Sequence, residues 1–148
     1  MISIRTLIRL LVPAIFLLAA ACSGNYTPDK LDAKSIGGYD QLFSALQSAG
    51  FSVEAAGDVT QPFFEPVGKV IKVDDQDIQV FEFGTESEAA LAAGEISPDG
   101  SSVGTSMVSW IAPPHFYQSG NIIVLYMGDE ASLMRFLEER LGAQVAGR

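Results

Sequence analysis

The chain has little of two residue types on which many enzyme sites depend, since its 148 residues include one cysteine and one histidine. A single cysteine excludes an internal disulfide, and a zinc or copper site would have to rest on carboxylates, which these metals disfavour. The sequence also lacks a glycine-rich phosphate-binding motif and the Gly-x-Ser-x-Gly motif of serine hydrolases. We therefore expect no metal and no cofactor.

Basic residues are also scarce, because 9 lysines and arginines stand against 18 aspartates and glutamates, and the formal net charge is −9. An acidic chain is repelled by phosphate backbones and anionic lipid headgroups, which argues against nucleic acid as a partner. The charges are unevenly placed: the first 21 residues carry two arginines and no acidic residue, whereas all 18 acidic residues follow them. The average composition thus describes two different parts of the chain.

The first part has the residue order of an export signal. Arg5 and Arg9 precede an uncharged apolar run at 10–21, and small residues lead up to Cys22. As a helix the apolar run would be about 18 Å long, which is well short of the roughly 30 Å hydrocarbon core of a bilayer. We expect residues 1–21 to be a cleaved signal peptide and not a membrane-spanning helix.

The residues around Cys22 read Leu-Ala-Ala-Ala-Cys-Ser-Gly and resemble the lipobox of bacterial lipoprotein precursors. In that family the cysteine is lipidated and becomes the new N-terminus after cleavage. The resemblance implies that acyl chains on Cys22 hold the protein at a membrane outside the cytoplasm, and at the outer membrane if the host is diderm. The alternative is an ordinary secretory signal, cleaved after Ala-x-Ala, with Cys22 present by chance.

Residues 22–38 follow the signal and are mainly polar, with Pro28 and a Gly-Gly pair, which is typical of a flexible tether. One part of this segment, 31–36, has an alternative interpretation in which it packs on the domain that follows. We expect residues 39–148 to form one globular domain, because a chain of this length supports a single core.

Hydrophobic periodicity and turn residues predict the secondary structure of this domain. The predicted helices span 39–49, 86–94 and 130–141, and the predicted strands span 51–57, 69–73, 78–83, 102–111 and 122–127. Thr85 and Glu88 have the spacing of a capping box before the second helix, and Asp129 is placed to cap the third. Residues 112–121 are expected to form an irregular connection, and 143–148 either a tail or an edge strand.

Strand, turn, strand and helix occur in the same order at 69–94 and at 102–141. Two such ββα-like units naturally form one sheet with their helices packed on the same face. We therefore predict an α+β fold: a single small domain with a mainly antiparallel sheet of about five strands and two to three helices on one face.

The histidine, His115, follows two prolines in the expected connection between strands. On a rigid loop it could donate a proton or bind a metal, with Asp99 or Asp129 as a carboxylate partner. The simpler interpretation, which we favour, is a loop histidine that is hydrogen-bonded to nearby backbone.

Two irregular segments combine prolines with large aromatic side chains. If these segments meet at one end of the sheet, they line a groove for a peptide, a glycan or an apolar ligand. The alternative is that the aromatic residues close the core of a small domain. The candidate groove residues are Phe63, Phe64, Trp110, His115, Phe116 and Tyr117.

The mature chain has a strand with a tryptophan, a Pro-Pro-His-Phe-Tyr loop, an Ile-Val-Leu-Tyr strand and a C-terminal helix, and over 39–142 it resembles small exported bacterial lipoproteins. That resemblance implies no activity and no site residues. We expect a lipid-anchored binding or interaction module of the cell envelope, with an envelope protein, peptide or glycan as partner. The alternative is a small envelope hydrolase or metal-dependent enzyme that uses His115 and a nearby carboxylate.

Overall fold

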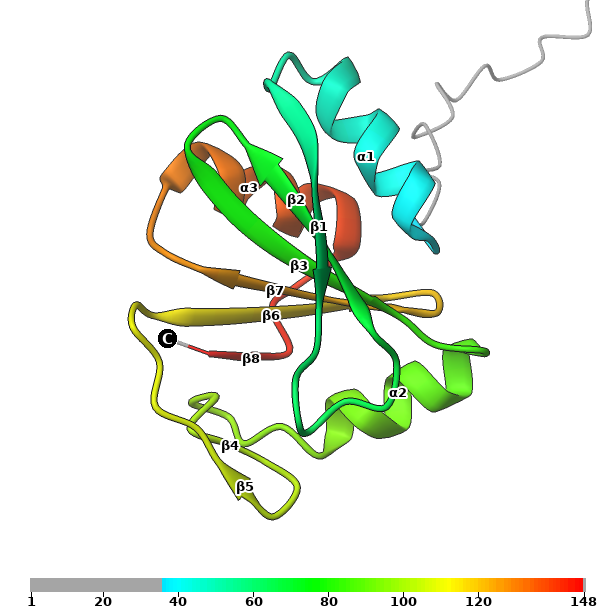
Figure 1. Cartoon of the computed structure of the whole chain (residues 1–148), viewed down its shortest axis with the longest axis vertical. Helices are drawn as coiled ribbons and strands as arrows, with labels where there is room; N and C mark the ends of the chain where they lie inside the picture. The colour runs from blue at the N-terminus through cyan, green and yellow to red at the C-terminus, as the bar shows by residue number, and fades with distance from the viewer. Residues whose placement is uncertain (1–35, 148) are drawn as a thin grey trace, which may run out of the picture.

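Six strands form the main sheet, in the order β1-β2-β3-β7-β6-β8, and every neighbouring pair is antiparallel. The computed structural model describes residues 36–147 (Figure 1). The strands of the main sheet are β1 (Val53–Val59), β2 (Gly68–Val73), β3 (Gln76–Glu82), β7 (Ile122–Met127), β6 (Pro114–Ser119) and β8 (Ala146–Gly147). A separate hairpin joins β4 (Ser102–Val103) to β5 (Ser106–Met107).

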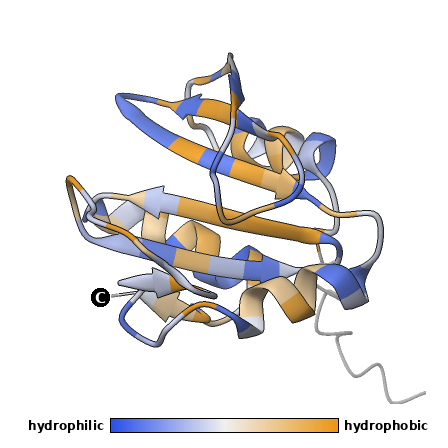
Figure 2. Ribbon diagram, turned by 60° about the horizontal axis from the view of Figure 1, so that its bottom comes forward, coloured by the Kyte–Doolittle hydropathy of each residue, from blue (hydrophilic) through white to orange (hydrophobic). Residues whose placement is uncertain are grey.

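Helices cover both faces of this sheet. The α1 helix (Tyr39–Ser48) and the α3 helix (Ala131–Leu141) pack on one face, and the α2 helix (Glu86–Gly94) packs on the other. Because successive strand residues point to opposite faces, Val80 of β3 joins the first core and Phe81 joins the second. Figure 2 shows the hydrophobic residues concentrated along the strands in the middle of the sheet, between these two helical layers.

The α+β class, the single small domain and the mainly antiparallel sheet are confirmed, with six strands in the main sheet. Two helices do share a face, but they are α1 and α3 and not the helices of the two ββα-like units. In both units three residues, 83–85 and 128–130, connect strand to helix, and this length allows a turn to either face. Because β3 and β7 are buried on both faces, their residue patterns do not predict on which face of the sheet the following helix packs.

The region 102–121 differs from its prediction. In place of one strand over 102–111 the chain forms the short β4–β5 hairpin, and β6 occupies the expected irregular connection. Pro114 is the first residue of β6, a position where a missing backbone N–H is tolerated. Gly120, at a φ of 53°, and Asn121 then close a tight turn into β7, so His115 lies on a strand and not on a loop.

The helix caps confirm one prediction and correct another. Thr85 and Glu88 form the expected capping box of α2. The cap of α3 is Glu130 and not Asp129, because the Glu130 carboxylate accepts the backbone N–H of Leu133 at 2.8 Å. Hydrogen bonds from the Ser132 side chain and from this backbone N–H lower the pKa of Glu130.

The described chain begins with a residue of the core. Ile36 is 5% exposed and belongs to the cluster that α1 and α3 form with the sheet, so the end of the expected tether packs on the domain. The predictions for the signal peptide, for Cys22 and for residues up to 35 lie outside the described residues. None of the helices within 36–147 has the length and the apolar character needed to cross a bilayer.

Candidate functional site

The two proline-flanked aromatic segments meet, as one of the sequence-based alternatives required. The Phe63 ring lies 5.0 Å from that of Phe64 and 6.0 Å from that of Trp110, and Trp110 lies 5.7 Å from Phe116. These pairs are edge-on, an arrangement favoured by aromatic quadrupoles. Phe64 and Phe116 are buried in the core beside α2, whereas Phe63 and Trp110 are half-buried at its margin. Most of the cluster therefore closes the core.

His115 and Tyr117 do not join this cluster. They alternate with Phe116 along β6, so their side chains lie on the opposite face of the sheet. Tyr117 belongs to the core beside α3, where burial raises the pKa of its hydroxyl. The His115 ring stacks on Tyr126 with their centroids 6.0 Å apart. The six residues of the predicted groove are thus divided between two faces.

The surroundings of His115 do not form an acid–base pair. The side chain is 2% exposed, and its Nδ1 lies 2.8 Å from Oε1 of Gln144, so the amide oxygen accepts the Nδ1 proton. The Nε2 atom is buried and has no hydrogen-bond partner among the described residues. An amide cannot exchange a proton as a carboxylate does, and within 36–147 no group of three or more His, Cys, Asp or Glu is arranged to hold a metal. This geometry gives no support to an enzyme centred on His115.

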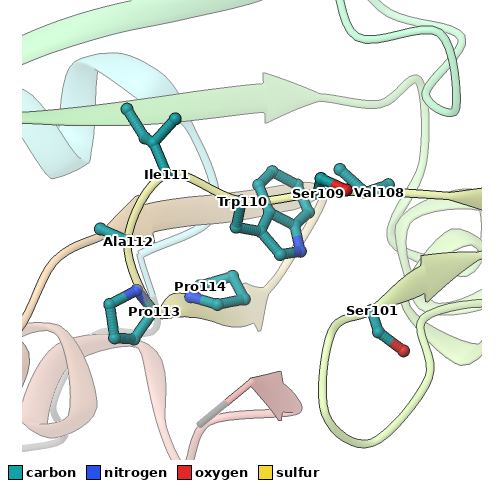
Figure 3. Close-up of a pocket in the computed structure, with 8 residues that line it drawn as sticks. All are labelled: Ser101, Val108, Ser109, Trp110, Ile111, Ala112, Pro113 and Pro114. Atoms are coloured by element: carbon teal, nitrogen blue, oxygen red, sulfur yellow. The ribbon is translucent and has the colours of Figure 1, made fainter.

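A different feature of the same region is an open hollow of about 450 Å³ in front of β6 (Figure 3). Trp110 forms one wall, and its indole Nε1 donates a hydrogen bond of 2.6 Å to the carbonyl oxygen of Gly100. Pro113 and Pro114 lie near the indole, and Ser101 lies on the neighbouring loop with its hydroxyl directed away from the indole. The residues that line the hollow are Ser101, Val108, Ser109, Trp110, Ile111, Ala112, Pro113 and Pro114.

Large apolar side chains are exposed beside this hollow. Ile111 is 94% exposed and points away from Trp110 and the prolines, and Met107, which precedes the lining residue Val108 in the chain, is 92% exposed. We call the hollow together with Met107 the Trp110 surface. Exposed large apolar residues at the rim of a preformed concavity are typical of a binding site.

The Trp110 surface has no charged side chain of its own. Residues 100–128 contain no Asp, Glu, Lys or Arg, so the polar groups in the hollow are serine hydroxyls and backbone. Such a surface can bind a ligand by apolar contact and hydrogen bonds, but it offers no general acid or base. The groove predicted from the sequence included Trp110 but not Met107 or Ile111. The long uncharged stretch around the Pro-Pro pair was the signal that could have identified these two residues as part of a binding surface.

The Ser101 hydroxyl and the indole of Trp110 are held in place by the local fold. Ser101 donates its backbone N–H at 3.0 Å and its hydroxyl at 2.8 Å to the Asp99 carboxylate, and the Ser97 hydroxyl donates to the same carboxylate. With the Trp110–Gly100 bond, these contacts fix the loop that faces the prolines.

Comparisons of the whole chain with known proteins find no matching family model, no similar curated protein and no similar solved structure.

Proposed function

We propose that this protein is a lipid-anchored binding module of the bacterial cell envelope, and that its ligand binds at the Trp110 surface. The observation that carries the proposal is the uncharged hollow in which Trp110 is held by a hydrogen bond while Ile111 remains 94% exposed. Exposing an isoleucine to water in this way forgoes about 1.5–3 kcal/mol of burial energy, which a partner can recover. Binding accounts for this exposure, whereas catalysis would need titratable groups that the hollow does not contain.

The anchoring part of the proposal rests on the lipobox resemblance around Cys22. Replacing Cys22→Ala is expected to move the protein from the membrane fraction to the soluble fraction, because several acyl chains contribute about 0.8 kcal/mol per buried methylene. Fractionation followed by mass spectrometry of the N-terminal peptide measures both the location and the lipid. Globomycin, which blocks lipoprotein signal cleavage, should leave the unprocessed precursor; an unchanged membrane fraction in the variant would contradict the anchor.

The binding part of the proposal predicts where a partner touches the protein in its native envelope. A photoreactive phenylalanine analogue at position 111 should give a defined crosslinked product, because this side chain points outward from the Trp110 surface. Position 91 in α2 is the matched control, since Leu91 is also a large apolar side chain and is 72% exposed. Immunoblots of irradiated cells measure the products. Equal crosslinking at 111 and 91, or none at 111, would argue against this surface as the binding site.

A further inference from the structure

The charges around the Trp110 surface restrict the chemistry of its ligand. Residues 36–147 contain 16 acidic and 4 basic side chains. The basic side chains lie elsewhere: Arg135 and Arg140 are on α3, which covers the opposite face, and Lys69 lies over the Tyr39 ring beside α1 at 4.8 Å. Lys72 is paired in the sheet between Glu54 and Asp77. Among the described residues no cation is therefore part of this surface.

Three carboxylate residues lie close to the segments that form the surface. Asp99 is bonded to Ser101 in the wall of the hollow. Glu95 lies beside the β4–β5 turn, where its backbone oxygen accepts the N–H of Gly104 at 2.8 Å. Asp129 follows Gly128, whose N–H donates to the carbonyl oxygen of Pro113 at 3.0 Å. All three carboxylate residues are exposed, so the uncharged hollow has negative charge near it.

We infer that the Trp110 surface binds an extended polypeptide segment with proline or other apolar residues at its centre and lysine or arginine on its flanks; this inference rests on the proposed function. The hollow suits an uncharged centre, because a negative charge placed against Trp110 and Pro113 would lose hydration without gaining a cation as partner, and a positive charge finds its carboxylates only outside the hollow. The bordering carboxylates attract the flanks, and the acidic domain accelerates their approach. Walls of tryptophan and proline suit a polyproline II segment, whose backbone can accept a bond from the Ser109 hydroxyl, since the Ser101 hydroxyl already donates to Asp99 at 2.8 Å.

The same charges disfavour other ligand classes. Nucleic acids and anionic bilayers would place negative charge beside Asp99 and Asp129. A neutral bilayer could accept the apolar side chains of Met107 and Ile111, but insertion to that depth would bring the bordering carboxylates out of water, which is costly. A peptide with an uncharged apolar centre and cationic flanks complements both the uncharged hollow and the carboxylates near it.

A selection from a random ten-residue peptide display library tests the inference directly. The target is the full chain purified as the cell makes it, and the enriched peptides are synthesised and titrated while the fluorescence of Trp110, the single tryptophan, is followed. We expect net positive peptides with proline or apolar centres, and a roughly tenfold weaker affinity at 300 mM than at 50 mM salt, because salt screens the flanking contacts. Exchanging their lysines and arginines for glutamates should abolish binding.

Matched variants connect this binding to the surface. Ile111→Ser should weaken binding about tenfold, whereas Leu91→Ser should leave it unchanged; both positions are exposed, so neither variant is expected to disturb folding. Peptides that need Ile111 but are neutral or acidic, and that bind equally at both salt concentrations, would overturn the inference and leave the proposed binding site standing. The absence of enriched peptides would overturn it too, with crosslinking at position 111 still reporting separately on the proposed function. Binding to phosphatidylcholine vesicles that is lost in Ile111→Ser would identify the surface as a membrane contact instead.

Discussion

Replacing Phe81→Ala is expected to lower the free energy of unfolding by about 3–5 kcal/mol, the range for a buried phenylalanine truncated in a core. Phe81 lies on β3 in the middle of the sheet, is fully buried, and packs 4.8 Å from the Phe64 ring in the cluster beneath α2. Removing the Phe81 ring would leave a cavity under the aromatic residues that support Trp110. Urea unfolding followed by circular dichroism measures the change, and a loss below about 1 kcal/mol would show that this core does not depend on the ring.

A double-mutant cycle with Gly68 distinguishes packing from a general weakening of the sheet. A Cβ atom at position 68 would lie 2.5 Å from the Phe81 ring, so Gly68→Ala alone is expected to cost about 1–3 kcal/mol by overpacking. In the Phe81→Ala background the added methyl enters the vacated space, and the same substitution should cost at least about 1 kcal/mol less. Strict additivity of the two substitutions would contradict the contact between the ring and Gly68.

Gly120→Ala is the second substitution with a large expected effect, and it acts through the backbone. Gly120 has a φ of 53°, which costs an L-residue about 1–2 kcal/mol. The added Cβ would also lie 2.6 Å from the Cα of Gly37, and this contact involves backbone that cannot rotate away. We therefore expect the variant to lose about 1–3 kcal/mol beyond the conformational cost, as overpacked sites do. Thermal unfolding of the variant and the parent protein measures the loss.

Gly104→Ala is the matched control for this prediction. Gly104 has a φ of 55°, but the nearest atom to its added Cβ is the Glu95 Oε2 at 3.7 Å, so only the conformational cost applies. A larger loss at position 120 than at 104 would show that the chain at Gly37 packs against the β6–β7 turn as part of the folded domain. Equal losses at both positions would mean that this N-terminal stretch can move aside.

Local residue patterns were sufficient to predict the elements whose signals lie within a few residues of each other. The Thr85–Glu88 capping box, the β2–β3 hairpin and the stripe of apolar residues on α3 all follow from spacing alone. The order of these elements also predicted the α+β class and the antiparallel sheet. The predicted cap of α3, Asp129, was wrong by one residue. Asp129 and Glu130 are both able to accept a backbone N–H, and the turn geometry decides between them in favour of Glu130.

The strand β6 could not be predicted in this way. Its residues show no alternation and begin at the second of two prolines, so local preference favoured an irregular connection. It becomes a strand because β7, which follows directly after the turn at Gly120 and Asn121, and β8, which comes from the C-terminal end of the described chain, satisfy its backbone on either side. That pairing turns His115 inward against Tyr126 and Gln144, which removes it from any surface.

For the candidate site, the sequence by itself determined that proline and aromatic residues are concentrated in two segments and that residues 100–128 carry no charge. Only the tertiary structure decided which of these side chains are available to a partner. Phe64 and Phe116 are buried because α2 and the sheet close over them, whereas Ile111 remains exposed because no element of 36–147 covers it. Burial depends on neighbours that are distant in sequence, and a residue pattern records which side chains are apolar without recording which of them find a place in the core.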